Sequence, residues 1–465
     1  MSDMNQNDTQ TNIPRDNKLL TSPISRLIPE MAIPTIIAFL INSIYSLADT
    51  FFVSGLGTNA TAAVSVNATL DQIIMMAGSM LAVGANSFVA RLLGAREKEK
   101  ADKVLSTAFF LAFGLGLLLA VFGTVFIGPL VDLLGATDTC RDYSIDYATY
   151  VLLAAPLMAS SFVMNQCLRA EGSAMLSMFG MGFGGILNCV LDPIFINGLG
   201  MGVKGASLAT AISKLVSFAI LVYPYMARHS VLRLSARCFY PKWNILSEII
   251  SVGMPSMLRS LLAVVTGILL NRIAGEISDS VMAGIGVATK IMMFPFSIIL
   301  GFGSGFQPVA GFNWGAKRFD RVRESYRYAG KMAFWGAAVM ALVLALLAQP
   351  ITALFAKDDP ELLRLGTLCI QFQCVALPIH AWVAVVNMLC AGLGYGGLAF
   401  LLATSRQGSC FLPILYPMAF LLGELGIISV QAAADVLTLL LAVPVCRVVL
   451  RRIDRAEQQG ELHEL

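Results

Sequence analysis

Long apolar segments alternate with short polar breaks along the whole chain, and this pattern predicts a bundle of membrane-spanning helices. A helix needs roughly 20 apolar residues to cross a bilayer. Twelve segments meet that length, near residues 30–56, 62–90, 104–128, 141–167, 174–196, 204–226, 246–272, 281–311, 329–349, 362–388, 397–420 and 429–450. Several are longer than the minimum and are expected to tilt or to extend beyond the bilayer. The pattern indicates an all-α polytopic membrane protein.

The two halves of the chain repeat each other. Pro34 and Pro255 lie 221 residues apart, and so do Gly94 and Gly315, and Pro129 and Pro350. A constant offset over this distance indicates duplication of a unit of six helices. Because six is even, both units enter the membrane from the same side, so they are parallel repeats related by a pseudo-two-fold axis along the membrane normal.

The repeat predicts two six-helix lobes and their connections. The expected organisation is a flexible cytoplasmic tail at 1–24, an N-terminal lobe at 25–226, an inter-lobe loop at 227–245, a C-terminal lobe at 246–450 and a cytoplasmic tail at 451–465. Two lobes that rock against each other can expose a central site to alternate sides of a membrane, which a static pore does not require.

Charge distribution predicts the orientation. Only 13% of the residues are charged, against about a quarter in ordinary globular proteins. The Lys and Arg residues cluster in the breaks after the second, sixth, eighth and twelfth predicted helices, so the positive-inside rule places these breaks and both termini in the cytoplasm. We therefore expect a multi-pass protein of a bacterial inner (plasma) membrane. The net charge of +3 gives no reason to expect a nucleic-acid partner.

Motifs of membrane-embedded enzymes are absent from the sequence. It contains no HExxH, GxSxG, phosphate-binding loop or Cys/His cluster, so neither enzymatic chemistry nor direct use of ATP is expected. No cofactor is predicted beyond a coupling ion. The nine Cys residues are interpreted as small buried side chains.

Polar residues inside the apolar segments of the N-terminal half converge on three helices. Asn42, Tyr45 and Asp49 share one face of the first predicted helix. Asn188 and Asp192, four residues apart, share a face of the fifth, and Thr210 lies in the sixth. Carboxylate, amide and hydroxyl oxygens suit H⁺ or Na⁺ and not zinc. The alternative is that Asp49 and Asp192 are hydrated residues at helix ends.

Two further features of this half bear on a transport site. Pro193 follows Asp192 and frees a backbone carbonyl that is a possible extra cation ligand. Tyr147 and Asn165 in the fourth predicted helix are candidates for the wall of a substrate cavity. Asp71 and Asp146 lie near outer helix ends and are given little weight, and Glu171 is expected to make only a local turn contact.

The C-terminal half carries intramembrane cations instead. Arg259 and Arg406 lie in the seventh and eleventh predicted helices, and Asp435 in the twelfth is a candidate partner for either. These arginines form a possible polar site of the C-terminal lobe. The alternative is that both side chains extend to the cytoplasmic interface and have no transport role.

Several motifs resemble those of the multidrug and toxic compound extrusion (MATE) family, in particular the bacterial branch with DinF-like and MepA-like exporters. They are EMAIPTIIAFLINSIYSLADTFFVSGLG, ANSFVARLLGARE, LRAEGSAMLSM, NCVLDPIFI, GMGVKGASLAT, GMPSMLRSLL and SRQG. The resemblance covers residues from about 25 to 450. It implies twelve helices in two lobes and export of cationic, amphipathic compounds, driven by inward H⁺ or Na⁺.

The resemblance also implies roles for single residues. In the branch with a cation site in the N-terminal lobe, the ligands match Asp49, Asn188, Asp192 and Thr210. Positions that line the cavity of that lobe match Asn42, Tyr45, Tyr147 and Asn165. Acids that couple transport through helices 7 and 10 in another branch are missing here, where helix 10 offers His380.

The prediction is therefore an antiporter that expels an organic cation while H⁺ or Na⁺ returns, acting as a monomer in the lipid bilayer. Ion binding at Asp49 and Asp192 is expected to bend the first helix at a hinge near Pro34. A flippase for lipids or lipid-linked oligosaccharides is the alternative within the same superfamily. Such a protein would line its cavity with Arg and Lys, and the acidic residues of the N-terminal lobe argue against it.

Overall fold

The computed structural model describes residues 18–356 and 359–464, and these residues are almost entirely helical. The N-terminal half contains α2 (Ile24–Ser54), α3 (Thr58–Gly94), α4 (Lys98–Val125), α5 (Ile127–Leu133), α6 (Arg141–Ala170), α7 (Ala174–Pro193) and α8 (Val203–Met226). The C-terminal half contains α9 (Trp243–Ile277), α10 (Asp279–Gly315), α11 (Phe319–Ala356), α12 (Pro360–Gly392), α13 (Gly396–Thr404) and α14 (Phe411–Glu464). π-helical turns at Ile194–Gly198 and Ser405–Ser409 extend α7 and α13.

Twelve membrane crossings are confirmed, although α13 and α14 form one nearly unbroken helical run. The backbone reverses inside α14 at Gly423, whose φ of 56° is unfavourable for other residues. Arg406 lies before this point and Asp435 after it, yet Nε of Arg406 lies 2.6 Å from Oδ1 of Asp435. A straight helix would separate these residues by about 43 Å. The run therefore folds back on itself and crosses the membrane twice.

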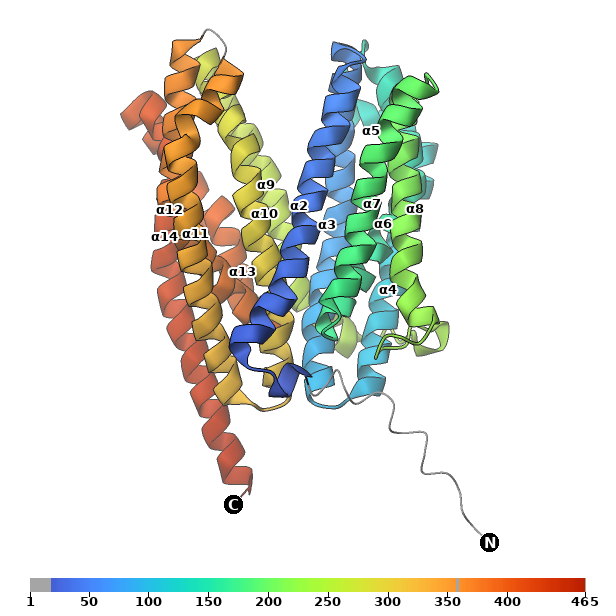
Figure 1. Cartoon of the computed structure of the whole chain (residues 1–465), viewed down its shortest axis with the longest axis vertical. Coiled ribbons are helices and arrows are strands. Elements are labelled where there is room, and N and C mark those ends of the chain that lie inside the picture. The colour runs from blue at the N-terminus through green and yellow to red at the C-terminus, as the bar shows by residue number, and fades with distance from the viewer. Residues whose placement is uncertain (1–17, 357–358, 465) are drawn as a thin grey trace.

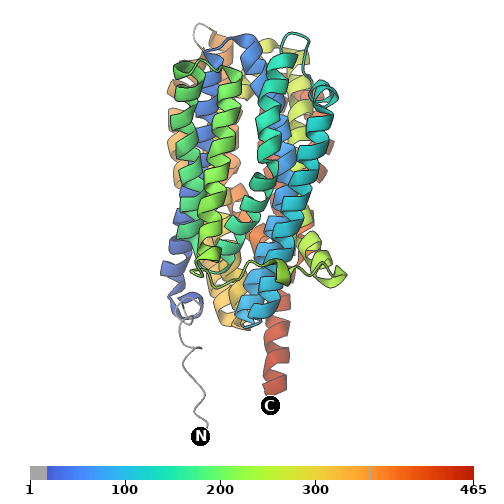
Figure 2. The ribbon, with the colours of Figure 1, turned by 90° about the vertical axis from the view of Figure 1, so that its right-hand side faces the viewer.

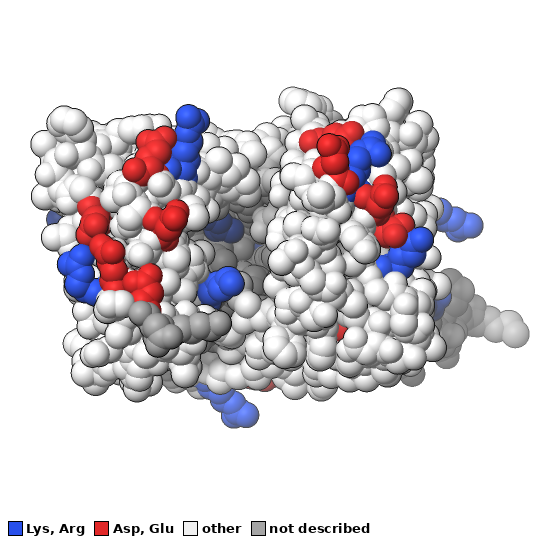
Figure 3. Space-filling view, turned by 90° about the horizontal axis from the view of Figure 1, so that it is seen from above, with Lys and Arg blue, Asp and Glu red and all other residues white. Residues whose placement is uncertain are grey.

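The two halves of the chain form two lobes that meet at one end of the molecule and separate at the other (Figure 1). The lobe of α2–α8 stands beside the lobe of α9–α14. The start of α2 and the end of α14 lie at the end where the lobes meet, called the closed end below. Viewed from the opposite, open end, the surface is hollowed between the lobes, and Lys or Arg side chains lie inside the hollow (Figure 3).

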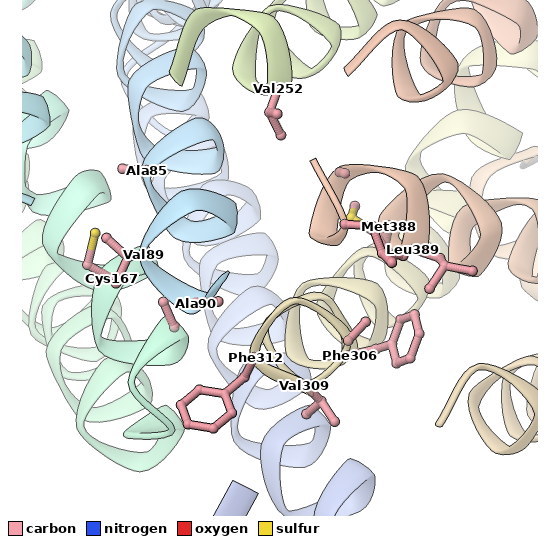
Figure 4. Close-up of a cluster of buried hydrophobic side chains, with 14 of the residues drawn as sticks. Ala85, Val89, Ala90, Cys167, Val252, Phe306, Val309, Phe312, Met388 and Leu389 are labelled. Atoms are coloured by element: carbon pink, nitrogen blue, oxygen red, sulfur yellow. The ribbon is translucent and has the colours of Figure 1, made fainter. Parts of the chain in front are cut away.

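The hydrophobic cores explain this shape. One core includes residues from both lobes, among them Val89 of α3, Cys167 of α6, Val252 of α9, Phe312 of α10 and Leu389 of α12 (Figure 4). Two other cores belong to single lobes: one draws its buried residues only from 53–206 and the other only from 273–434. Apolar packing thus joins the lobes at the closed end, while each lobe has its own core elsewhere.

Glycines allow the helices of the two lobes to cross closely. A Cβ atom on Gly84 of α3 would lie 2.0 Å from the backbone oxygen of Ile249 in α9, and one on Gly253 would lie 1.8 Å from that of Met80. The crossing of α2 with α10 repeats this arrangement, with Gly301 against Ile36 and Gly305 against Ala32. The matched pair of crossings is the structural counterpart of the sequence repeat.

Polar contacts also join the lobes at the closed end. Arg91 of α3 forms an ion pair of 2.6 Å with Glu248 of α9. Arg321 of α11 donates to the carbonyls of Leu19 and Ser22 at 3.2 and 2.7 Å, and Leu19 is buried. Residues 18–24, expected to belong to a flexible tail, are therefore packed against the C-terminal lobe. Residues 1–17 of that expected tail lie outside the described residues.

The other predicted tail is helical. α14 continues to Glu464, and its last turns project beyond the bundle (Figure 2). Arg323 at the start of α11 binds Asp454 at 2.6 Å and Glu457 at 2.5 Å in this extension. These ion pairs hold the extension against α11 where it leaves the bundle.

The inter-lobe loop of residues 227–245 is bound to the N-terminal lobe. Glu171, at the end of α6, accepts hydrogen bonds from the Ser230 hydroxyl at 2.6 Å and from the backbone N–H of Val231 at 2.9 Å. Asp102 of α4 accepts one from the N–H of Arg233 at 2.8 Å. The expectation that Glu171 makes only a local turn contact is wrong, because its carboxylate orders a loop about sixty residues away in the chain.

Candidate functional site

Asp49 lies buried in the N-terminal lobe, where α2 faces α6. The hydroxyl of Tyr147 donates to its Oδ2 at 3.1 Å, and its Oδ1 has no hydrogen-bond partner in the described part of the protein. A buried carboxylate with a free oxygen is costly unless a proton or a cation completes its coordination. The geometry therefore leaves Asp49 able to bind one more ligand.

Asn188, Asp192 and Thr210 meet between α7 and α8. With the Asn188 amide turned so that both of its ends are satisfied, its N–H donates to Oδ2 of Asp192 at 2.9 Å and its oxygen accepts from the Thr210 hydroxyl at 3.1 Å. Asp192 is fully buried, and its Oδ1 lacks a partner among the described residues. The structure thus brings together three of the four residues expected to bind the ion, whereas the fourth, Asp49, is bound by Tyr147.

The local backbone places these groups. α7 ends at Pro193, directly after Asp192, and continues as the π-helical turn Ile194–Gly198. π-helical turns are uncommon and often occur at functional sites. The C-terminal lobe has its counterpart in the π-helical turn Ser405–Ser409, which carries Arg406 and Gln407. Both lobes therefore interrupt regular helix beside their polar residues.

Two charged residues join this cluster without having been selected from the sequence. The ammonium group of Lys214, one turn after Thr210 in α8, lies 5.0 Å from the centre of the Tyr45 ring. Asp71 of α3, which was given little weight, interacts electrostatically with Lys214 and Asp49. In the sequence, Lys214 is a lone cation inside an apolar segment, and such a residue is a candidate for a functional role. With Asp49 and Asp192, this cluster holds three carboxylates against one ammonium group.

The residues expected to line the substrate cavity take two different positions. Asn42, Asn165 and Lys214 line a small cavity of about 60 Å³ inside the N-terminal lobe. The Asn165 amide also donates to the carbonyl of Ser177 at 2.9 Å, which fixes its orientation. Tyr147 lies in the core beside Asp49, and Tyr45 lies under Lys214. The two tyrosines contact the charged residues, and the two asparagines line the cavity.

Pro34 lies buried in α2 close to the crossing with α10, between Ala32 and Ile36, which contact Gly305 and Gly301. α2 stays helical through this proline. A proline inside a helix removes one backbone hydrogen bond and weakens the helix at that point. A hinge near Pro34 would therefore act directly on an inter-lobe contact.

The C-terminal lobe contains a second polar cluster. Arg406 binds Asp435 through Nε at 2.6 Å and through a second nitrogen at 3.4 Å, and its guanidinium lies 4.6 Å from the centre of the Phe296 ring. Nδ1 of His380 lies 3.9 Å from the same carboxylate. Asp435 therefore pairs with Arg406, one of the two arginines for which the sequence made it a candidate partner.

Arg259 and Arg406 line a cavity of about 420 Å³ between α9, α10, α12 and the α13 region. Gln72 of α3 also contributes to its wall, so the cavity reaches the N-terminal lobe. Both arginines therefore line an internal cavity.

The structure has two lobes of six membrane-crossing helices each. They share a core at one end, separate at the other and hold polar clusters around internal cavities. This arrangement defines a two-lobed membrane transporter. The MatE family model matches residues 34–194 and, a second time, residues 255–416. The chain belongs to this family, the MATE transporters, and the double match confirms the internal repeat.

Known proteins similar to this chain agree with that assignment. The multidrug export protein MepA of Staphylococcus aureus (strain MSSA476) is 27% identical over 424 residues, which cover 91% of this chain and 93% of that protein. A multidrug resistance MATE family transporter solved in an outward-facing conformation is 28% identical with a TM-score of 0.89, covering 94% of this chain and 98% of that one. A MATE solved in a bent conformation is 27% identical with the same TM-score, covering 96% and 100%.

Proposed function

We propose that this protein is a secondary active multidrug efflux antiporter, which exports cationic amphipathic compounds in exchange for inward H⁺ or Na⁺. Its relatives include proteins named for multidrug export. The observation that carries the ion-coupled part is the buried carboxylate pair Asp49 and Asp192, each with one oxygen free of hydrogen bonds from the described residues. Two such groups in one lobe favour uptake of a proton or a cation.

The proposed exchange follows from competition for negative charge. With both carboxylates ionised, the N-terminal lobe attracts an organic cation entering the cavity. When H⁺ or Na⁺ binds Asp49 or Asp192, this attraction weakens and the cation is released. A site that cannot hold both ligands at once couples their movements in opposite directions.

Alternating access follows from the division of the cores. The positive-inside rule places the closed end in the cytoplasm, so the structure corresponds to an outward-open state in a bacterial inner membrane. The inward-open state then requires that the shared core separate at the crossings of α3 with α9 and of α2 with α10. Pro34 lies at the second crossing and is the proposed hinge.

The test is substrate efflux from proteoliposomes under separately imposed pH and Na⁺ gradients. A fluorescent lipophilic cation is the probe, and efflux driven by only one of the gradients identifies the coupling ion. D49N and D192N should each abolish gradient-driven efflux while the purified variants keep the elution profile of the wild type. D146N is the matched control, because Asp146 is paired with Lys204 and is partly exposed outside this cluster. Full gradient-driven efflux by both D49N and D192N would exclude the mechanism.

A further inference from the structure

We propose that a groove on the outer face of α11 binds the phosphate group of an anionic phospholipid, and that the bound lipid stabilises the closed end of the transporter. The groove has a volume of about 310 Å³ and lies between α11 and α12. It is lined by two cations, Arg327 and Lys331, and by the aromatic side chains of Tyr326, Phe334, Trp335 and Trp382. None of these described residues lines the cavities between the lobes, so the groove is a separate site.

The groove lies on a face of α11 that points away from the protein. The Trp335 side chain is 67% exposed, and Val339 and Leu342 further along α11 are 63% and 62% exposed. A continuous set of large exposed apolar side chains is expected on a surface that contacts lipid. Trp is enriched where the lipid headgroups meet the acyl chains. The orientation proposed above therefore places the groove in the cytoplasmic leaflet, at the level of the headgroups.

Two cations lie at the end of the groove nearer the closed end. Arg327 and Lys331 are about one helical turn apart, and both are exposed. Neither forms an ion pair with a residue that the structure describes. The acids around the start of α11 act on other cations: Asp320 on Arg318, Glu324 on Arg321, and Asp454 and Glu457 on Arg323. Like charges at this spacing repel each other, and a phosphate that contacts both groups would offset the repulsion.

The corresponding face of the N-terminal lobe is covered by the chain itself. The repeat offset of 221 residues relates Arg327 to Ser106 and Lys331 to Phe110, both in α4. There the inter-lobe loop packs on the helix, with the ring centre of Phe239 at 5.9 Å from that of Phe110. The C-terminal lobe has an open groove and two cations at the same positions. A lipid from the bilayer would therefore take the place that the loop fills in the other lobe.

A phospholipid fits this groove better than free phosphate does, because the groove has a cationic part and an apolar part. Arg327 and Lys331 supply donors for phosphate oxygens, and an arginine can donate two parallel hydrogen bonds to one phosphate. Phe334 and Trp335 follow Lys331 within four residues, and Trp382 of α12 completes the wall. These rings suit the glycerol and the first acyl carbons of a lipid. An anionic headgroup is favoured over phosphatidylcholine, whose quaternary amine would add a further cation.

The same part of α11 holds the two lobes together. The hydroxyl of Tyr328, next to Arg327, donates to the carbonyl of Ser25 at the start of α2, at 3.3 Å. Two turns earlier, Arg321 donates to the carbonyl of Ser22 at 2.7 Å. A lipid bound at Arg327 and Lys331 would fix the first turns of α11 and so support both contacts with the N-terminal lobe. Anionic lipid should therefore favour the state in which this end is closed.

The first experiment measures lipid binding. Purified protein in a neutral detergent is titrated with phosphatidylglycerol, phosphatidylcholine or inorganic phosphate, and the bound molecules are counted by native mass spectrometry. The wild type should bind phosphatidylglycerol more tightly than phosphatidylcholine. In R327Q/K331Q, the Kd for phosphatidylglycerol should rise at least about tenfold, the effect of losing charge-assisted contacts. R447Q/R451Q is the matched control, because it removes two exposed arginines at the same spacing in α14, outside the groove, and should bind like the wild type.

A further variant separates the lipid from free phosphate. W335A removes the exposed ring and keeps both cations, so it should weaken binding of phosphatidylglycerol and leave binding of inorganic phosphate unchanged. Equal binding of phosphatidylglycerol by the wild type and R327Q/K331Q, or an equal loss in R447Q/R451Q, would overturn the site. Binding of inorganic phosphate as tight as that of phosphatidylglycerol would show that the groove takes free phosphate and that the assignment to a lipid is wrong.

The second experiment tests the role at the closed end. Spin labels at the exposed residues Thr58 and Glu276, in a background without native cysteines, report the distance between the lobes in phosphatidylcholine vesicles with and without phosphatidylglycerol. Phosphatidylglycerol should raise the ratio of closed to open states at this end at least about twofold in the wild type and leave it unchanged in R327Q/K331Q. An unchanged wild-type distribution would overturn this role. Neither experiment uses efflux as its readout, so failure here and failure of the proposed function are distinguishable.

Discussion

The hydroxyl group of Tyr147 donates a hydrogen bond of 3.1 Å to Oδ2 of Asp49, and it is the only hydrogen bond that this carboxylate accepts from the described side chains. The contact joins α6 to α2, so a ligand that changes the charge of Asp49 also changes the contact between these helices. In Y147F, gradient-driven efflux should fall about tenfold to hundredfold, because a hydrogen bond to a charged group contributes about 1.5–3 kcal/mol. Y143F, which alters an exposed tyrosine one turn earlier, is the control. Equal efflux by the two variants would show that the contact has no role in coupling.

Gly84 should be necessary for the closed end. An alanine there would place its Cβ 2.0 Å from the backbone oxygen of Ile249, whereas the Cβ of an alanine at Gly114 would have no neighbour within 4 Å. G84A should therefore destabilise the proposed outward-open state by about 1–3 kcal/mol. G114A should be neutral or stabilising by up to about 1 kcal/mol, since Ala favours helix. Thermal unfolding of both purified variants distinguishes the two effects, and equal melting temperatures would contradict the close crossing.

The Arg91–Glu248 ion pair should bias the lobes toward the outward-open state. Its side chains are partly exposed, so its contribution is about 0.5–1 kcal/mol, or a two- to fivefold change in population. E248Q should increase the inward-open population by this factor. Distances between spin labels at Thr58 and Glu276, both exposed near the open end, report the change in a background without native cysteines. The exchanged pair R91E/E248R should restore the wild-type distribution. An unchanged distance distribution in E248Q would show that the ion pair does not affect the balance between the two states.

Breaking the Arg406–Asp435 pair should destabilise the C-terminal lobe. D435N leaves a second unpaired guanidinium beside Arg259, at a cost of about 3 kcal/mol. The double variant D435N/R406M removes that charge and should regain most of the loss in thermal stability. If the double variant is less stable than D435N, the arginine is stabilised by contacts other than the aspartate.

Glu171 should control the order of the inter-lobe loop. E171A removes the acceptor for the Ser230 hydroxyl and the Val231 N–H, so amide hydrogen exchange at residues 230–233 should become at least about tenfold faster. E97A, which removes an exposed carboxylate paired with Lys100, should leave exchange in this loop unchanged. Unchanged exchange in E171A would mean that other contacts hold the loop.

The sequence predicted the helices and the repeat because both are recorded along the chain. Each crossing is long enough to recognise, and the prolines and glycines of the two halves keep a fixed offset. It also identified Asp49, Asn188, Asp192 and Thr210 as a set, from spacing and from resemblance. Periodicity alone could not show that Tyr147 donates to Asp49, because the two residues lie 98 positions apart.

The surroundings of other residues could not be predicted from the sequence, for physical reasons. Asp71 looked like a residue of an outer helix end, since position along a helix does not show how deeply a neighbouring helix covers it. Arg259 and Arg406 were compatible with the membrane interface, because long side chains can reach it from inside the bilayer. Only the packing of α9, α10 and α12 places them in a cavity.

The sequence by itself determined the membrane class, the twelve crossings, the two related lobes and the candidate oxygen ligands, because hydrophobic length, repeat offset and residue chemistry are properties of the chain. The tertiary structure decided which end is closed, how the residues of the site meet and how the two lobes differ in charge. Inward-open and outward-open states have the same sequence and the same helical periodicity. The choice between them lies in contacts between distant helices, such as Gly84 with Ile249 and Arg91 with Glu248, and these form only when the lobes pack.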